Sequence, residues 1–144
     1  MKALIDTNII IDILERREPF FADSYRIIQL GLDGSTETFM SAGSVTDVFY
    51  IINHSIRDSN RAKEKIFALA MLVNICNTTS DDISTALTLP LPDFEDAVIA
   101  AIAKREKADY IISRNEKDFA NSPVPAVSPA QFFKETRKSR AGTA

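Results

Sequence analysis

The chain has 144 residues, of which 45% are hydrophobic and 26% are charged, and its formal net charge is −3. This length and this balance are typical of one ordinary globular domain, which can bury a core large enough for stability without disulfides or structural metals. The small negative charge argues against bulk binding of polyanions, although it leaves room for a local basic patch beside an acidic site.

Short apolar runs alternate with segments of helical spacing along the chain, and glycines, prolines and polar caps separate them. The expected strands are residues 3–5, 36–41, 72–76, 108–112 and 124–127. The expected helices are residues 9–15, 22–32, a helix capped by Ser44 that runs past Ile52, 59–71, a short helix capped by Ser80, 93–107, and 128–134.

This order of elements predicts an α/β fold of three layers, in which helices cover both faces of a central, mostly parallel sheet of four to five strands. We expect one domain over residues 1–136 and a polar, frayed tail over residues 137–144. In such folds the functional crevice lies beyond the carboxyl ends of the strands. Asp6 and the turn after Ile112 are both expected at such positions.

The sequence also excludes several other classes of protein. A single cysteine, Cys76, rules out an internal disulfide, and one cysteine with one histidine makes a zinc site implausible. The N-terminal residues lack the basic start and long apolar stretch of a signal peptide, and no run approaches the roughly 18 apolar residues of a membrane span. We therefore expect a cytoplasmic protein that does not contact membranes.

Acidic residues and one asparagine recur where strands end or helices begin. They are Asp6, Asp47, Asp93, Asp96, Asn115 and Asp118. Acids at helix starts can simply cap free N–H groups and match the helix dipole, for about 0.3–1 kcal/mol each. Asp6 is harder to explain in this way, because an ionised carboxylate at the end of a buried strand is costly unless it is paired or bound to a metal.

Binding of a hard divalent cation is a physical reason for carboxylates to gather in one place. Mg²⁺ prefers oxygen ligands and binds through one or two carboxylates together with substrate phosphate. Without the cation, converging acids would repel one another, and the pKa of some of them would rise. From spacing alone, capping and metal binding both remain open for these residues.

Four segments resemble the motifs of PIN domains, in the same order along the chain. The first contains Asp6-Thr7-Asn8 after the opening strand, and the others are residues 93–101, 108–119 and 127–133. The resemblance covers nearly the whole chain and implies a PIN-like α/β/α fold with a metal-dependent nuclease site. Within the family the chain is most similar to VapC-type toxin ribonucleases of type II toxin–antitoxin systems.

By this resemblance, Asp6 and Asp96 are expected to bind Mg²⁺ or Mn²⁺ directly. Asp47 falls where the family usually has Glu, so it is expected to reach the metal directly or through a water molecule. Asn115 matches a position at which many members have Asp, and it can ligate only through a neutral carbonyl. Asp118 could supply the missing charge or could only stabilise the turn.

The remaining candidates are expected to support this site. Residues that orient Asp6 or border the crevice would be Thr7, Asn8, Asp93 and Ser113. Arg114 and Lys117 lie in the turn beside the site and are candidates for contacts with RNA phosphates. A further basic cluster near one helix start contains Arg57, Arg61, Lys63 and Lys65.

The resemblance implies an endoribonuclease that acts on RNA, forms homodimers and has an antitoxin protein as partner. One alternative is a catalytically degenerate PIN domain that binds RNA or a protein, which the departures at Asp47 and Asn115 favour. Another is an aspartate-based phosphoryl-transfer enzyme similar to haloacid-dehalogenase-like phosphatases. Those enzymes have Asp-x-Asp after the first strand, and Asn8 occupies the second of these positions here.

Overall fold

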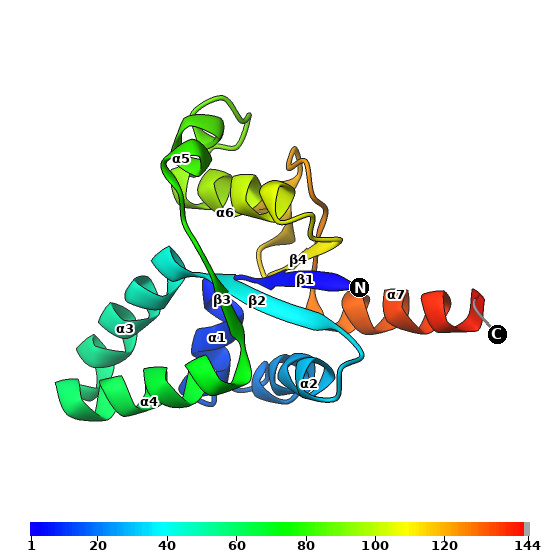
Figure 1. The fold of residues 1–144 in the computed structure, drawn as a ribbon. Coiled ribbons are helices and arrows are strands. Elements are labelled where there is room, and N and C mark those ends of the chain that lie inside the picture. The colour runs from blue at the N-terminus through cyan, green and yellow to red at the C-terminus, as the bar shows by residue number, and fades with distance from the viewer. Residues whose placement is uncertain (143–144) are drawn as a thin grey trace.

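The computed structural model describes residues 1–142, with side chains to residue 139. Within this range five strands form one sheet, in the order β3-β2-β1-β4-β5, and every pairing is parallel (Figure 1). The strands are β1 (Lys2–Ile5), β2 (Glu37–Ser41), β3 (Asn74–Cys76), β4 (Tyr110–Ile112) and β5 (Ala126–Val127). Because β1 is central, the residue that follows it lies in the middle of one sheet edge.

Helices cover both faces of the sheet, which confirms the expected three layers (Figure 1). One face is covered by α1 (Thr7–Leu14), α2 (Phe21–Leu32), α3 (Ala42–Ile56), α4 (Ser59–Leu72) and α7 (Pro129–Gly142). The other face is covered by α5 (Ser80–Ala86) and α6 (Phe94–Arg105), together with the 3-10 helix η1 (Glu116–Phe119). No helix within the described part of the chain is both long and apolar enough to cross a membrane.

The two faces of the sheet have separate hydrophobic cores. Ala3 and Ile5 of β1 belong to the core under α1 to α4, whereas Leu4 belongs to the core under α6. On β4, Ile112 belongs to the core under α1 to α4 and Ile111 belongs to the core under α6. Successive strand residues point to opposite faces, so a strand buried on both faces must be apolar throughout.

The capping residues of two helices differ from the expectation, because other residues that can cap a helix stand nearby in the sequence. The cap of α3 is Ser41, whose hydroxyl accepts a hydrogen bond from the Ser44 backbone N–H at 3.2 Å, so the helix begins before Ser44. Thr79, not Ser80, caps α5, and Asp82 closes a capping box with it. The position that has an extended backbone becomes the cap.

The last helix is longer than expected. We expected it to end near Lys134, but α7 continues to Gly142, so residues 137–142 of the expected tail are helical. Residues 143 and 144 of that tail lie outside the described residues. The end of α7 is polar and has no apolar face, so the periodic signal that predicts helices stops before the helix does.

Candidate functional site

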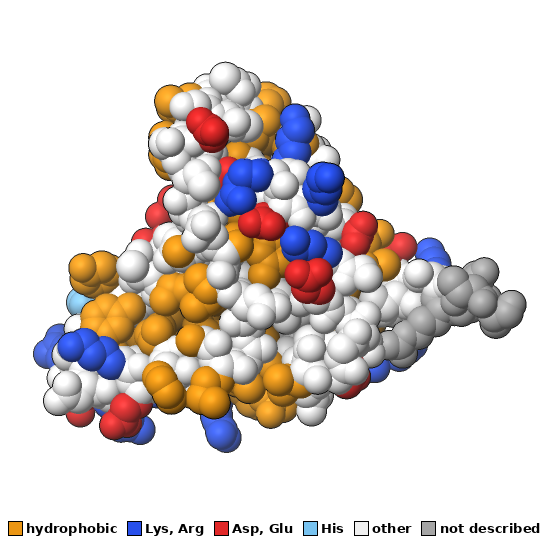
Figure 2. Space-filling view, viewed as in Figure 1, with side chains coloured by type: hydrophobic (Ala, Val, Ile, Leu, Met, Phe, Trp, Pro, Cys, Tyr) orange, Lys and Arg blue, Asp and Glu red, His pale blue; other side chains and the backbone are white. Residues whose placement is uncertain are grey.

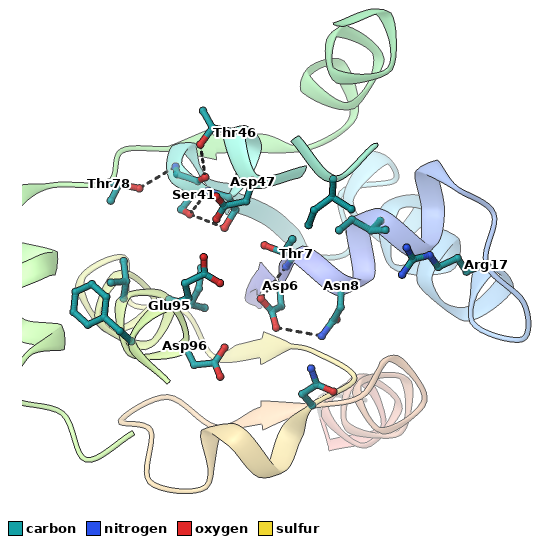
Figure 3. A pocket seen from close by; sticks show the side chains of 18 residues that line it. Asp6, Thr7, Asn8, Arg17, Ser41, Thr46, Asp47, Thr78, Glu95 and Asp96 are labelled. Atoms are coloured by element: carbon teal, nitrogen blue, oxygen red, sulfur yellow. Dashed lines mark hydrogen bonds between the residues drawn. The ribbon is translucent and has the colours of Figure 1, made fainter. Parts of the chain in front are cut away.

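A pocket of about 500 Å³ lies beyond the carboxyl ends of the central strands (Figure 3). Four acidic side chains line it: Asp6 after β1, Asp47 on α3, and Glu95 and Asp96 at the start of α6. Figure 3 shows these carboxylates around one space, although they come from three separate parts of the chain. We call this site the acidic pocket.

Asp6 is held in one orientation by its hydrogen bonds. The residue caps α1, and its Oδ1 accepts from the Thr7 backbone N–H at 2.8 Å. Its Oδ2 accepts from the Ser113 hydroxyl at 2.8 Å and from Asn8 Nδ2 at 3.4 Å. Only 8% of Asp6 is exposed, so these donors replace water as partners of the carboxylate.

Ser113 and Asn8 connect the turn after β4 to the start of α1. Asn8 Nδ2 donates to Ser113 Oγ at 3.2 Å, and Asn8 Oδ1 accepts from the Arg114 backbone N–H at 3.2 Å. The Asn115 backbone N–H also donates to Ser113 Oγ, at 3.0 Å. Ser113 is fully buried behind Asp6, so it positions Asp6 and does not face the pocket.

The crowding of carboxylates changes their acidity. Burial, followed by the charges of Asp6, Asp93, Asp118 and Glu95, raises the pKa of Asp96 to about 7. Burial likewise raises the pKa of Asp6, and the hydrogen bonds from Ser113 and Thr7 oppose this rise. These carboxylates would be stabilised by a cation placed between them.

The pKa of Glu95 is also raised, first by burial and then by the charges of Asp47, Asp93 and Asp6. Glu95 was not among the residues that sequence reasoning selected. The sequence does offer a signal, because Glu95 adjoins Asp96, but an acid in the first turn of a helix is already explained by the helix dipole.

Most of the residues expected at the site do line the acidic pocket. Besides the acids they are Thr7, Asn8 and Asn115. Asp93 does not line it but caps α6, because its Oδ1 accepts from the Asp96 backbone N–H at 3.0 Å. Asp118 lies in η1 outside the pocket, and it acts on Asp6 and Asp96 through its charge.

The two expected phosphate contacts do not line the acidic pocket. The Arg114 guanidinium binds the fully buried Asp12 through Nε at 2.5 Å and Nη2 at 3.1 Å, and it stacks on Phe20 at 4.0 Å from the ring centre. Its charge is therefore committed to Asp12. Lys117 is exposed in η1.

Sequence reasoning also missed polar residues at the pocket wall. Thr46 and Thr78 line it, and so does Arg17 from the turn between α1 and α2. Arg17 Nη2 is paired with Glu15 Oε2 at 2.8 Å. No motif singles out these residues, because the approach of Thr78 and Arg17 to Asp6 depends on the packing of the elements around them.

The donor set fits a hard cation such as Mg²⁺ or Mn²⁺. The side chains that could ligate a metal at the acidic pocket offer carboxylate, amide and hydroxyl oxygens, which these ions prefer. Within residues 1–142, no three His, Cys, Asp or Glu side chains are placed to hold one ion together. Mg²⁺ usually keeps several water ligands and is bound by one or two carboxylates.

Known proteins resemble the chain in both sequence and fold. A sequence model of the PIN domain family matches residues 2–117. Ribonuclease VapC1 of Aquifex aeolicus (strain VF5) is 24% identical over 136 residues, which cover 91% of this chain and 92% of that protein.

Two solved structures have a similar fold. VapBC2 from Rickettsia felis, solved with a DNA fragment from its promoter, contains a chain with a TM-score of 0.72 and 16% identity; the match covers 89% of this chain and 98% of that chain. A toxin–antitoxin complex from Klebsiella pneumoniae contains a chain with a TM-score of 0.64 and 24% identity, and the match covers 88% and 97%. At these identities the likeness shows the fold.

Proposed function

The chain belongs to the PIN-domain family, and we propose that it is a metal-dependent endoribonuclease that hydrolyses phosphodiester bonds of RNA. The observation that supports this most strongly is the acidic pocket, in which Asp6, Asp47, Glu95 and Asp96 converge from distant parts of the chain. The relative from Aquifex aeolicus is named a ribonuclease, and it matches nearly the full length of this chain.

In this proposal Asp6 and Asp96 hold Mg²⁺ or Mn²⁺, and Asp47 reaches it directly or through water. A divalent ion bound there would polarise the phosphoryl oxygen and promote ionisation of an attacking water. Thr7, Asn8 and Ser113 keep the Asp6 carboxylate in place through the hydrogen bonds described above.

The other polar residues set the charge of this site and the acidity of its carboxylates. Asn115 offers a neutral amide at the pocket wall, so the proposed site has one negative charge fewer than a site with Asp at this position. Asp118 and Asp93 add negative charge from outside the pocket, which raises the pKa of Asp96 and favours capture of a cation. Glu95 faces the pocket and is a further candidate for holding a metal-bound water.

We further propose that the protein is the toxin of a toxin–antitoxin pair, acts in the cytoplasm, binds an antitoxin protein and forms a homodimer. The fold it shares with a chain of the Klebsiella pneumoniae toxin–antitoxin complex supports its role as a toxin and its binding of an antitoxin. Exposed apolar side chains support a protein interface, since Tyr50, Phe67 and Met71 on α3 and α4 are each at least 70% exposed. Figure 2 shows hydrophobic side chains gathered over this part of the molecule.

Cleavage of a labelled RNA tests the proposed activity. Purified protein should cut the RNA with Mg²⁺ or Mn²⁺ and not with EDTA. Asp6→Asn and Asp96→Asn should lower the rate at least about 100-fold, with unchanged circular dichroism. Equal cleavage by well-purified Asp6→Asn protein would contradict the assignment.

The same assay separates the two alternative functions. RNA binding without cleavage in either metal would favour a catalytically inactive domain, which the neutral Asn115 at the pocket wall makes the second candidate. Metal-dependent turnover of p-nitrophenyl phosphate that is lost in Asp6→Asn, without RNA cleavage, would instead favour a phosphatase.

A further inference from the structure

A second pocket, of about 560 Å³, lies where the end of α1 meets the end of α3 and the start of α4. Its lining contains three cationic side chains, Arg16, Arg61 and Lys65, and one acidic side chain, Glu15. Arg61 and Lys65 are four residues apart on α4 and so share one helix face. We call this site the basic pocket.

The positive charge of the basic pocket is not neutralised from within the described residues. Its one carboxylate, Glu15, is paired with Arg17, which contributes both Nη2 at 2.8 Å and Nε at 3.0 Å. None of Arg16, Arg61 and Lys65 forms an ion pair within residues 1–139. Lys65 Nζ donates to the backbone carbonyl of Leu14 at 3.0 Å, so Arg16 and Arg61 are the two cations of this concave site that are suited to an anionic ligand.

A single turn connects this pocket to the acidic pocket. After α1, the Arg16 N–H donates to Ile13 O at 3.3 Å and the Arg17 N–H donates to Asp12 O at 2.9 Å. These two bonds form a Schellman motif, in which Arg16 has a left-handed φ of 49°. The turn directs Arg16 to the basic pocket and Arg17 to the acidic pocket. Arg17 of the acidic pocket is paired with Glu15 of the basic pocket at 2.8 Å, so the linings of the two pockets are in contact.

We propose that the basic pocket binds backbone phosphates of the RNA strand whose scissile phosphate lies in the acidic pocket. This inference rests on the proposed function, because it takes RNA as the substrate. The chain has a net charge of −3, and the acidic pocket itself repels phosphates until a cation is bound. Phosphate contacts supply much of the affinity of proteins for nucleic acids, so cations next to the site are needed to retain the strand.

The structure separates the cations of α4 into two groups. Sequence reasoning placed Arg57, Arg61, Lys63 and Lys65 in one basic cluster. Only Arg61 and Lys65 line the basic pocket, whereas Lys63 lines an apolar depression beside Tyr50. Lys63 therefore serves as a control on the same helix.

The test variant is Arg16→Gly/Arg61→Gln. Glycine is the preferred residue at the left-handed position of a Schellman motif, so Arg16→Gly removes a charge without straining the turn. The side chain of Arg61 has no ion pair, and its backbone N–H, which bonds to Asp58, is kept in Arg61→Gln. Arg16→Gly also removes the contact of the guanidinium with the Phe21 ring, at 5.6 Å from the ring centre, which contributes only weakly to stability at an exposed site. The melting temperature should therefore stay close to that of the unmodified protein.

The matched control is Lys107→Gly/Lys63→Gln, which removes the same number of charges elsewhere. Lys107 also has a left-handed φ, of 57°, in the turn after α6, where its N–H donates to Lys104 O and that of Ala108 to Ala103 O. It is thus the same kind of helix end as Arg16. Neither Lys107 nor Lys63 lines the acidic or the basic pocket.

Binding of a short, labelled single-stranded RNA is measured by fluorescence anisotropy in EDTA, so that no cleavage occurs, over a series of KCl concentrations. Without metal the acidic pocket weakens RNA binding equally in all the variants, so a difference between variants reports on the basic pocket. For a single strand, each lost phosphate contact makes the negative slope of log K against log salt shallower by about 0.7. The slope of the test variant should therefore be shallower by about 1.4. It should also bind several-fold more weakly at low salt. The control variant should keep the original slope.

Equal slopes for the test and control variants would overturn the inference. So would a test variant that binds RNA normally but loses binding of poly-glutamate, because the pocket would then be built for an acidic protein. The binding assay is independent of catalysis. If the protein cuts no RNA but the variants show the predicted difference in slope, only the proposed nuclease activity is wrong. If the protein cuts RNA but the slopes are equal, only the proposed role of the basic pocket is wrong.

Discussion

Asp96 carries an unfavourable charge in the folded protein without metal. Its pKa is raised from 3.8 to about 7, chiefly by burial and then by the neighbouring charges of Asp6, Asp93, Asp118 and Glu95. As the pH rises between these two values, the unfolded chain loses this proton while the folded chain keeps it. The folded state then binds more protons than the unfolded state, so the stability of the metal-free protein falls as pH rises through this range.

We predict that the melting temperature in EDTA is lower at about pH 8 than at about pH 5, and that Mg²⁺ removes much of this difference. Asp96→Asn should reduce the pH-dependent part of the unfolding free energy by about 1–2 kcal/mol, less than the full shift implies because the carboxyl is partly exposed. Asp23→Asn is the control, since Asp23 is an exposed acid in the first turn of α2. An unchanged pH dependence in Asp96→Asn would contradict the prediction.

At the scale of single residues, the sequence identifies acids that have no simple structural explanation. Asp6 could be selected because it follows a buried strand, where an ionised carboxylate needs a partner. Arg114 was assigned a phosphate contact because its actual partner, Asp12, is 102 positions away in the sequence. An ion pair of that separation is created by the fold, and no local pattern reveals it.

The pair of Asp12 and Arg114 connects two elements, α1 and the turn that follows β4. Asp12 is fully buried, and Arg114 both pairs with its carboxylate and stacks on the ring of Phe20. The same turn contains Ser113, which donates to Asp6, and Asn115, which lines the acidic pocket. The ion pair therefore holds the turn in the position that Asp6 requires.

We predict that Asp12→Asn lowers the free energy of unfolding by about 2 kcal/mol, which is less than for a fully buried pair because Arg114 retains contact with solvent. Cleavage should fall as well, because the turn loses its anchor to α1. Urea unfolding and the RNA assay measure the two effects. The double variant Asp12→Leu/Arg114→Met should regain part of the stability, whereas stability equal to that of Asp12→Asn would show that the pair is not the cause.

At the scale of elements, the pattern of apolar residues predicted the existence of every strand and α-helix, and local chemistry decided their ends. Strand β3 is shorter than its apolar run because Val73 caps α4 and does not pair with β2. The sequence predicted Ser44 as the cap of α3, and this was wrong because Ser41 is the cap. Hydrogen-bond geometry, which the sequence does not contain, makes this choice.

At the scale of the whole molecule, α7 completes the core with its first turns only. Phe132 is fully buried and packs edge-on against Tyr110 of β4. The side chains of residues 137–139 are exposed, and Lys138 forms only a 4.0 Å ion pair with Glu135. We therefore propose that the folding unit ends near residue 136.

We predict that a chain of residues 1–136 unfolds within about 1 kcal/mol of the full chain, because exposed ion pairs contribute little. Phe132→Ala should cost about 3–4 kcal/mol, because it leaves a cavity in the core. Both are measured by urea unfolding monitored by circular dichroism. Failure of the 1–136 chain to fold would extend the domain through the end of α7.

The overall arrangement was predictable because it follows from a few strong constraints. Short buried strands that alternate with helices allow few layouts other than a parallel sheet covered on both faces. The strand order then brings the carboxyl ends of β1, β2 and β4 to one edge. The basic pocket was not predictable, since it depends on how the ends of α1, α3 and α4 pack together.

The lining of the acidic pocket begins at Asp6 and ends at Asn115. During synthesis Asp6 leaves the ribosome early, but the turn that holds it, with Ser113, emerges only late. A nascent polypeptide therefore has no assembled acidic pocket, and any activity of this pocket begins only after the residues up to Asn115 have emerged.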